Sequence, residues 1–387
     1  MDFRYTEEQL ALQDTLQRFI ARDYDFERRR ALTRSELGYS AEAWARLAEL
    51  GVLALPFREE LGGLGGTGVD VMVVMEQIGR GLLLEPFLST AVLCGRLLED
   101  LAPRPLGAAL VAQVIEGRLR LAFAGYEAAG RYDVSHVACR AVRAGDGWRL
   151  SGTKTVVLDA PSAESFLVAA RTGGQVTDRA GISLFLVPRA SAGVTVEGYA
   201  TQSGGRAGDL RLEGVTLAHE ALLGVVDQAL PAIERAVERA TAALCAEALG
   251  IVTALNKATL EYLKSRKQFG VAIGNFQALQ HRMADMYIAE EQARSMAILA
   301  AVNADADDAG TRARTTGAAK AYVGQAARFV GQQAVQLHGA MGVVDELIVS
   351  HYFKRLTVLD LTFGDADYHL GRFSDSLAAA APRAQAP

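Results

Sequence analysis

The sequences GWRLSG (147–152) and TVVL (155–158) belong to a series of short apolar runs separated by turns. The other runs are LRLAFA (119–124), HVACRAV (136–142), SFLVAA (165–170), ISLFLV (182–187), VTVEGY (194–199) and LRLEGV (210–215). Runs of this length between turn residues are typical of β-strands, and Gly145-Asp146-Gly147 between two of them is a hairpin signal. We therefore expect residues 119–226 to form an all-β domain, built as a small barrel or a sandwich.

The residues before this domain have a helical pattern. Apolar side chains near the N-terminus recur at roughly the 3.6-residue period of an amphipathic helix: Leu10, Leu12, Leu16, Phe19 and Ile20. A second helix is expected near residues 41–50, where Gly51 is a C-cap signal. The glycine-rich run GGLGGTG (62–68) follows no strand, so it is interpreted as a link between helices rather than a phosphate-binding loop. Residues 1–118 are expected to form an N-terminal helical domain.

The residues after the β-domain are again helical. An Ala- and Leu-rich helix is expected to run to Ser265, and a third long helix from Arg312 to about Leu337, with two more flanking Phe363. Between them, a helix after Phe276 presents one stripe that we expect to be buried: Phe276, Leu279, Met283, Met286 and Ala293. Residues 227–387 should therefore form an antiparallel four-helix bundle, with the last seven residues frayed. The predicted fold class is α+β, mostly α, in three domains.

The composition excludes several classes of protein. The 387 residues carry a net charge of −5 with no block of like charges, which argues against a nucleic-acid partner, since such a protein would show a basic face. We find no apolar run long enough to span a bilayer and no secretory signal at the N-terminus, so no membrane association is expected. Three scattered cysteines favour a reducing cytoplasm, and neither they nor the six histidines have the spacing of metal ligands.

The segment SRKQFGVAIGNFQALQ (265–280) contains side chains suited to a dinucleotide. Arg266 supplies a planar fork of donors that matches a pyrophosphate, and Phe269 offers an aromatic wall. Gln277 adds a neutral donor and acceptor, and Gly270 permits a tight turn at the end of a helix. From the residues alone, the segment could also be an ordinary helix C-terminus whose cations complement the helix dipole.

A second segment, QLHGAMG (336–342), lies at the end of the predicted third long helix. Its glycines would let a ligand approach the backbone closely. Gln336, His338 and Gly339 are the candidates, although His338 could equally be a packed histidine.

Both segments, at this separation, resemble the acyl-CoA dehydrogenase family, which carries R-K-x-F-G followed by F-Q and later Q-x-x-G-G-x-G. The helical, β, helical order extends the likeness over the whole chain. The resemblance implies FAD as cofactor, an acyl-CoA thioester as substrate and electron-transfer flavoprotein as acceptor. In the family these segments hold the ADP half of an FAD whose flavin lies in the neighbouring subunit. The cofactor-binding candidates are therefore Arg266, Gln268, Phe269, Phe276, Gln277, Gln336, His338 and Gly339.

The stretch YFKRLTVLDLTFGDADYHL (352–370) resembles the family segment whose Tyr-Glu-Gly-Thr turn carries the catalytic base. With Gly364 on the family glycine, the glutamate position is Phe363, and a phenyl ring cannot accept a proton. The family's alternative position for the glutamate, on an earlier helix, is Ala240.

Other carboxylates are the remaining candidate bases. Asp365 follows Phe363 by two residues but has a shorter side chain and another direction, and aspartates in TFGDAD are more often turn and cap residues. Glu238 points away from the face of Ala240, and Glu247 lies on that face about two turns further along.

The β-domain departs from the family at the region implied to contact substrate. The family sequence T-E-P-x-A-G-S-D corresponds to residues 126–133, YEAAGRYD, where only Glu127 and Asp133 match. Tyr132 replaces the serine and Arg131 replaces a glycine, so bulky side chains stand where a substrate would need room.

The resemblance also breaks down where the family contacts the flavin. Val156 stands at the position of an aromatic residue and Leu158 at that of a hydroxyl, and TVVL is interpreted as a buried strand.

The segments that serve a neighbour's FAD are thus kept, and those that would build the chain's own site are altered together. The sequence looks most like the small, degenerate subunit of hetero-oligomers of the pimeloyl-CoA dehydrogenase type, which act on bulky or unusual acyl chains. That implies a homologous catalytic subunit as partner, in a heterotetramer with two copies of each chain. The alternatives are a self-sufficient homo-oligomeric flavoenzyme with a relocated base such as Asp365, and a flavin-free assembly or acyl-binding partner.

Overall fold

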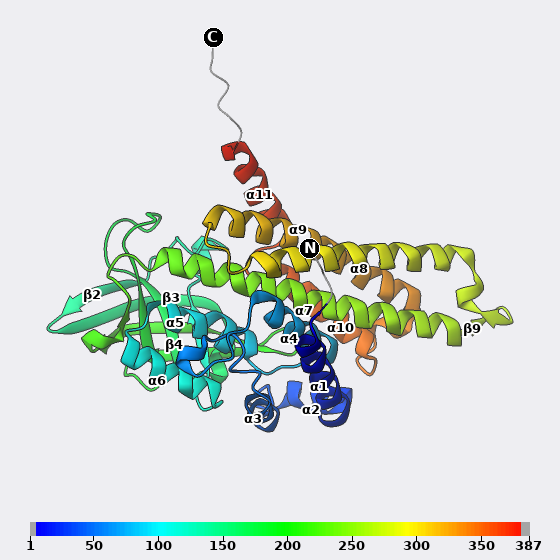
Figure 1. Ribbon diagram of the computed structural model, residues 1–387, viewed down its shortest axis with the longest axis horizontal. Coiled ribbons are helices and arrows are strands. Elements are labelled where there is room, and N and C mark those ends of the chain that lie inside the picture. Colours follow the sequence, from blue (N-terminus) through cyan, green and yellow to red (C-terminus); the bar gives the residue numbers. More distant parts are fainter. Residues whose placement is uncertain (1–4, 381–387) are drawn as a thin grey trace, which may run out of the picture. The chain divides into compact units, whose positions relative to one another are not determined.

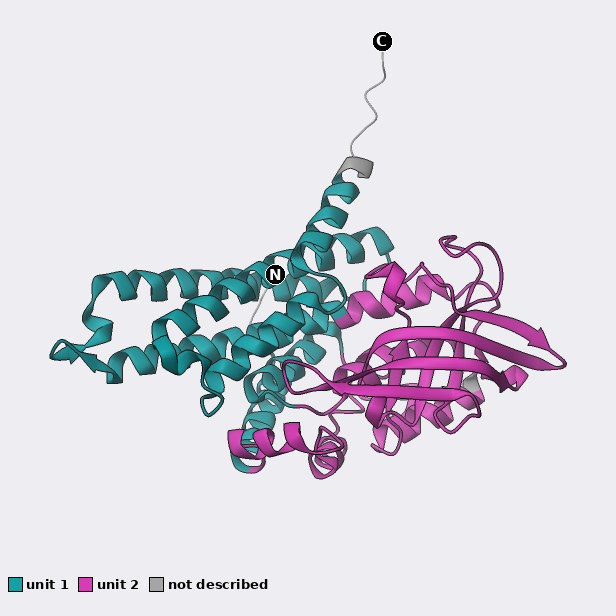
Figure 2. Ribbon diagram, turned by 180° about the vertical axis from the view of Figure 1, so that it is seen from behind, with its two compact units in different colours: residues 1–22, 67–83, 241–387 teal, residues 23–66, 84–240 magenta. Residues whose placement is uncertain are grey.

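The computed structural model describes residues 5–380, and the last seven residues, expected to fray, lie outside this range (Figure 1). By their internal contacts the residues form two compact units (Figure 2). Unit 1 comprises residues 1–22, 67–83 and 241–387, and unit 2 comprises residues 23–66 and 84–240. Each unit therefore combines stretches that are far apart in the sequence.

The first part of the chain is helical, as its periodicity predicts. Its helices are α1 (Glu7–Asp23), α2 (Phe26–Arg34), α3 (Ala41–Glu49), η1 (Glu59–Leu61), α4 (Gly68–Gly81), η2 (Leu88–Gly95), α5 (Arg96–Leu101) and α6 (Arg104–Ile115). The glycine-rich run links η1 to α4, which confirms its interpretation as a connection between helices. Helix α4 begins with a capping box in which the backbone N–H of Thr67 donates to Asp70.

Strands β1 to β8 belong to unit 2 and form one connected sheet, in the order β6-β7-β3-β2-β4-β5-β8, with β1 on β4. Their bounds are β1 (Leu121–Ala124), β2 (Arg140–Ala144), β3 (Gly147–Leu158), β4 (Ser165–Arg171), β5 (Ile182–Pro188), β6 (Val194–Ala200), β7 (Arg206–Leu217) and β8 (Leu222–Leu223). The predicted hairpin is confirmed, because β2 and β3 pair antiparallel across Gly145 and Asp146. Strands β2 and β4 join in parallel through the pair Arg140 and Arg171.

The bundle follows the β-domain along the chain. Its elements are α7 (Leu230–Ser265), β9 (Lys267–Gln268), β10 (Val271–Ala272), η6 (Ile273–Asn275), α8 (Gln277–Asn303), α9 (Ala309–His338), η7 (Gly339–Val343), α10 (Ile348–Leu361) and α11 (Ala366–Ala380). Helix α9 packs against α8, α10 and α11. Its central face is rich in alanine and glycine, which lets these helices approach closely.

Two expectations about the bundle are corrected. The predicted stripe of α8 is buried at Met286 and Ala293, but Phe276 is 38% exposed because it precedes the helix at the open end of the bundle. The most apolar window of α7 is long and apolar enough, by length and composition, to cross a bilayer. Since 72% of that window is buried inside the protein, it has the surroundings of a core helix.

Helices α4 and α7 touch backbone to backbone within unit 1. A Cβ at Gly79 would lie 2.1 Å from the carbonyl oxygen of Glu247, and one at Gly250 would lie 2.0 Å from that of Glu76. Both positions therefore require glycine, and this contact fixes the spacing of the two helices.

Candidate functional site

The β9-β10 hairpin projects from the end of α7 and carries the first predicted segment. Phe269 and Gly270 form its two-residue turn, with φ of +52° and +83°, the backbone signs of a type I′ hairpin. Phe269 is 91% exposed, and its ring meets the edge of Phe276, at a centroid distance of 6.1 Å. A large aromatic side chain is thus held in solvent on a backbone conformation that favours glycine.

The second predicted segment lies at the same end of the bundle. The ring of Tyr262, on α7, stacks on His338 at the end of α9, with centroids 4.4 Å apart. The Tyr262 hydroxyl also donates to the carbonyl oxygen of His338, at 3.4 Å. On α8, Arg282 Nη1 donates to Gln333 of α9, at 2.9 Å. The residues that flank the first segment on α7 and α8 therefore contact the end of α9, where the second segment begins.

The His338 side chain is packed inside unit 1. Its ring is buried, and Nδ1 lies 2.8 Å from the carbonyl oxygen of Ala334 one turn earlier. Burial lowers the pKa of His338, so the ring is neutral and donates this bond. Its role in the structure is to join α7 and α9.

The other predicted cofactor-binding side chains face solvent. Arg266, Gln268, Gln277 and Gln336 are exposed, and the Arg266 guanidinium makes no hydrogen bond or ion pair with any described residue. Helix α8 begins at Gln277 with no side-chain cap, so its first backbone N–H groups are available to an anion. Gly339 has φ of +61° and nothing within 4 Å of where a Cβ would stand. This donor set fits the diphosphate half of FAD.

The turn that carries Phe363 joins α10 to α11 in the same unit. Phe363 has φ of +57° and Gly364 has φ of +111°. The buried Lys320 ammonium donates to the carbonyl oxygens of Leu359, Asp360 and Gly364, at 2.8–2.9 Å. These contacts satisfy the last carbonyls of α10 and fix the turn.

His369 holds the same turn from α11. Its Nε2 donates to the carbonyl oxygen of Phe363, at 3.0 Å, because a carbonyl can only accept. Burial, with the Lys320 charge nearby, lowers the pKa of His369 to about 4. The backbone of the turn is thus rigid although its central side chain is a phenyl ring.

The alternative bases are each held in another role or position. Asp365 Oδ1 accepts the Tyr368 N–H at 2.8 Å, which confirms it as a cap residue, at the start of α11. Glu247 is buried and paired in bidentate fashion with Arg355, at 2.6 and 3.0 Å. Glu238 is 8% exposed, and Ala240 is fully buried.

In unit 2, Glu127 supports the loop that was implied to contact substrate. The wholly buried Lys154 ammonium lies 2.7 Å from Glu127, which also accepts the N–H groups of Ala138 and Cys139. Burial alone would raise the pKa of Glu127, but Lys154 and these donors hold it below its usual range. The matching glutamate is therefore part of a buried ion pair.

The rest of this loop is shaped by its own contacts. Asp133 accepts both the N–H and the hydroxyl of Ser135. Arg131 is exposed with φ of +48°, and Tyr132 is half-buried. Both bulky replacements therefore reach the surface of the unit.

The interpretation of TVVL as a buried strand is wrong at Val156. Strand β3 has a register shift between Lys154 and Val157, and Val156 sits in it with φ of +52° and its side chain 58% exposed. Its N–H leaves the ladder and donates to Asp209 at 3.0 Å. Leu158 is half-buried.

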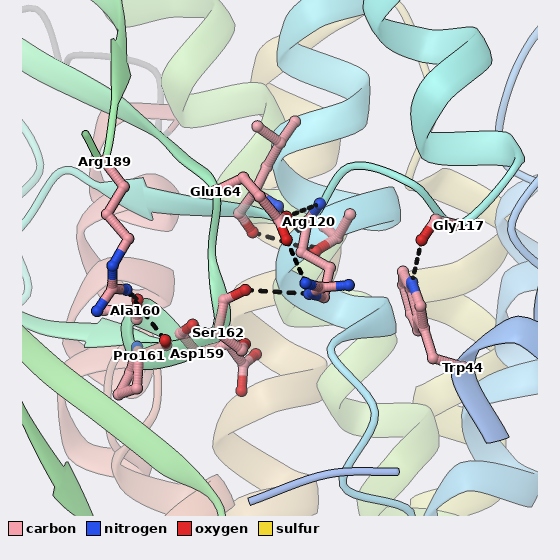
Figure 3. Close-up of polar contacts among 11 residues, drawn as sticks. Trp44, Gly117, Arg120, Asp159, Ala160, Pro161, Ser162, Glu164 and Arg189 are labelled. Carbon is pink, nitrogen blue, oxygen red and sulfur yellow. Dashed lines mark hydrogen bonds and ion pairs between the residues drawn. The ribbon is translucent and has the colours of Figure 1, made fainter. Parts of the chain in front are cut away.

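Two arginines hold the end of β3. Figure 3 shows Arg120 and Arg189 reaching the turn η4 (Ala160–Ser162). Arg120 Nε donates to the carbonyl oxygen of Ser162 at 3.0 Å, and Arg189 Nη1 donates to those of Ala160 and Pro161 at 2.8 and 3.0 Å. These bonds fix η4, the turn that follows β3.

Sequence reasoning missed Lys320 and Tyr262, and it gave Lys154 no role. Lys320 stands in the apolar run GAAKAYVG, where its position on the buried face of α9 was the available signal. Nothing local to Tyr262 marks its partner, since His338 is seventy-six residues away.

The acyl-CoA dehydrogenase N-terminal, middle and C-terminal domain models match residues 6–101, 122–215 and 230–378. The chain is 29% identical to the Mycobacterium tuberculosis acyl-CoA dehydrogenase FadE27, over 98% of this chain and 99% of that protein. It is 28% identical to the short-chain specific mitochondrial enzyme of Bos taurus, covering 83% and 79%.

Solved structures give the same answer. A variant of the Tcur3481-Tcur3483 steroid ACAD is 32% identical with a TM-score of 0.86, covering 97% of this chain and 98% of that one. The ChsE4-ChsE5 complex from Mycobacterium tuberculosis is 27% identical with a TM-score of 0.88, covering all of both chains. The chain therefore belongs to the acyl-CoA dehydrogenase family, the FAD-dependent oxidoreductases that act on CH–CH bonds.

Proposed function

We propose that this chain is the non-catalytic subunit of a hetero-oligomeric acyl-CoA dehydrogenase and completes the FAD site of a homologous catalytic subunit. One observation carries the proposal. In unit 1, the exposed hydrogen-bond donors around Arg266 that the cofactor would need are present. The rigid turn at which the family places its catalytic carboxylate has Phe363 at that position.

The chemistry of the reaction explains why this combination suits a partner. When bound, FAD supplies the acceptor for the hydride removed from the acyl chain. A carboxylate within hydrogen-bond reach must take the neighbouring proton, and the Phe363 turn offers none. Asp365 is committed to capping α11. In this proposal the diphosphate half of FAD is bound by four exposed side chains, Arg266, Gln268, Gln277 and Gln336. The rings of Phe269 and Phe276 pack against it, and Gly339, which has no side chain, leaves space for it.

The relatives support a two-chain assembly. The ChsE4-ChsE5 and Tcur3481-Tcur3483 structures each name two components, and both resemble this chain over nearly its whole length. The caffeyl-CoA reductase–Etf complex subunit CarC of Acetobacterium woodii is 27% identical, which supports an electron-transfer flavoprotein as acceptor. We extend the proposal to an acyl-CoA substrate with a bulky chain, and to the cytoplasm, where buried free cysteines such as these stay reduced.

The test is to purify the full chain alone and with a candidate catalytic subunit, then measure flavin absorbance and acyl-CoA oxidation. We expect no turnover from the lone chain and one FAD per pair of chains in an active complex. Stoichiometric flavin with robust turnover in the lone chain would refute the proposal.

A variant localises the contribution of this chain. Arg266→Gln removes the guanidinium and should lower FAD retention in the complex by roughly tenfold or more, since bonds to a charged donor are worth ~1.5–3 kcal/mol. Lys264→Gln is the matched control, because Lys264 is an exposed cation two residues away that pairs with Glu261. If both variants keep FAD equally well, Arg266 does not serve the cofactor.

A further inference from the structure

Unit 1 contains a groove that is lined by none of the residues proposed to bind FAD. It is formed by α1, α4 and α7 and has a volume of about 480 Å³, within the range of small-molecule sites. The backbone contact between α4 and α7 at Gly79 and Gly250 fixes two of its walls. Helix α1, the third wall, packs closely against the end of α4, because a Cβ at Gly81 would lie 2.9 Å from Cγ2 of Ile20 on α1. The groove is therefore preformed.

Its inner surface is largely apolar. Ile20 and Ala21 line it from α1, and Ala254 and Ala258 line it from α7. The methyl groups of the two alanines leave the space that longer side chains on α7 would fill. A surface of this kind accommodates an aliphatic chain.

Two cations line the same groove. Arg80 comes from α4 and Lys257 from α7, and neither side chain makes a hydrogen bond or an ion pair within residues 5–380. Arg80 is half-buried, so a partner there would be only partly screened by water.

The carboxylates nearby are already engaged. Glu261, on the groove, is paired with Lys264 at 2.9 Å. Glu76 lies one turn before Arg80, is buried and accepts the Tyr5 hydroxyl at 3.0 Å. Arg80 also acts on Glu76 through its charge, but neither Arg80 nor Lys257 makes a side-chain hydrogen bond or an ion pair with a described residue, so the groove favours an anion.

A buried amide adds a second, independent sign of a missing partner. Gln77 lines the groove from α4 and is fully buried, and neither its amide nitrogen nor its amide oxygen has a hydrogen-bond partner among the described residues. Buried polar groups in folded proteins are nearly always paired. A ligand that draws the amide toward the groove would supply its N–H with an acceptor.

We propose that this groove binds a small amphipathic carboxylate. The planar guanidinium of Arg80 takes the carboxylate in bidentate fashion, and Lys257 adds a second charge at the rim. The aliphatic chain lies along Ile20, Ala254 and Ala258. The apolar lining favours a carboxylate with an alkyl chain over inorganic phosphate. The site is separate from the FAD-binding residues, so it stands or falls independently of the proposed subunit role.

The test uses the full chain and octanoate as the probe, titrated by calorimetry, with 1-octanol and inorganic phosphate for comparison. We expect octanoate to bind, and 1-octanol and phosphate to bind at least about tenfold more weakly. The alcohol has no negative charge for the two cations, and phosphate has no alkyl chain for the apolar lining. Arg80→Gln should weaken octanoate binding by about tenfold or more, and Lys257→Gln by less, since Lys257 is exposed.

Two further variants separate the groove from other sites. Ala258→Leu fills the groove without changing its charge and should abolish binding. Arg18→Gln is the matched control, because Arg18 lies on α1, is exposed and pairs with Asp14 outside the groove lining. Circular dichroism confirms that each variant is folded.

Three results would overturn the proposal. Octanoate binding that survives both Arg80→Gln and Ala258→Leu would place the ligand elsewhere. Equal binding of 1-octanol would show that the cations are not used. No octanoate binding at millimolar concentration would reject a small carboxylate and leave the groove to an acidic segment of another protein.

Discussion

Lys320 is the side chain that holds the Phe363 turn most directly. Its buried ammonium donates to three carbonyl oxygens around the end of α10, although burial lowers the pKa of this lysine. Lys320→Met keeps the length of the side chain and leaves three acceptors without their donor. We expect the free energy of unfolding to fall by about 3 kcal/mol, measured by urea denaturation. Lys264→Met, at an exposed position, should change it by less than about 0.5 kcal/mol.

His369 makes the same turn sensitive to acid. Its pKa in the folded protein is about 4, below the ordinary 6.5, so only the unfolded chain takes up a proton as the pH falls between these values. Stability should therefore decrease from about pH 6.5 to about pH 4, by up to ~3 kcal/mol from this residue. Thermal melting of His369→Gln across this range should show a shallower decrease. His281→Gln, an exposed histidine in the same unit, is the control, and an equal slope in all three proteins would contradict the assignment.

The residues that could be predicted differ from those that could not by the range of their contacts. Asp365 was interpreted as a turn or cap residue from its local sequence, and its bond to the Tyr368 N–H three residues later confirms this. The contacts of Lys320 lie about forty residues away and depend on how α9 packs against α10. The apolar run around Lys320 indicates that this lysine is buried, but local sequence does not identify the carbonyl groups that it contacts.

The β9-β10 hairpin combines local strain with an exposed aromatic tip. Phe269 has a left-handed backbone and is 91% exposed, so it contributes little to the stability of the lone chain. Phe269→Gly should raise the free energy of unfolding by about 1 kcal/mol by relieving the turn. The same change should weaken FAD retention in the complex, because it removes the proposed wall. Differential scanning calorimetry and flavin absorbance measure the two effects.

The control for this prediction is Tyr287→Gly, which removes another exposed aromatic side chain on α8. Glycine inside a helix should destabilise that variant by about 1 kcal/mol and leave FAD retention unchanged. If Phe269→Gly destabilises the lone chain as well, the tip packs on the protein and is not held for a partner.

Elements were predictable where the pattern is local and repeated. The helices and the β2-β3 hairpin follow from periodicity and from Gly145. The burial of individual side chains was less predictable. Val156 and Phe276 are apolar and were assigned to buried positions, yet both are exposed. Val156 is turned outward by an irregularity in β3, and Phe276 precedes the first turn of α8 at an open end. Neither the register shift nor the open end can be deduced from side-chain type.

At the scale of the whole molecule, the segments 265–280 and 336–342 together with the order helical, β, helical predicted the family and its fold, and both are confirmed. The role of the chain within an assembly depends on residues spread over both compact units. Phe363 belongs to unit 1, whereas Val156, Leu158 and Ala240 belong to unit 2. The proposed subunit role therefore requires that the losses in the two units be coupled.

Phe363→Glu tests this coupling. Lys320, His369 and Asp365 fix the backbone of the turn, so a glutamate there would occupy the position implied for a base without refolding the segment. If Phe363 were the only loss, the variant would turn over acyl-CoA by itself. We expect no turnover from the lone Phe363→Glu chain, because Val156 and Leu158 still replace the residues expected to face a flavin. Phe363→Gln, which has the same shape but no carboxylate, is the control in a dye-reduction assay. Turnover by the glutamate variant alone would show that a single substitution separates this chain from a self-sufficient enzyme, and the proposal of coordinated losses would have to be abandoned.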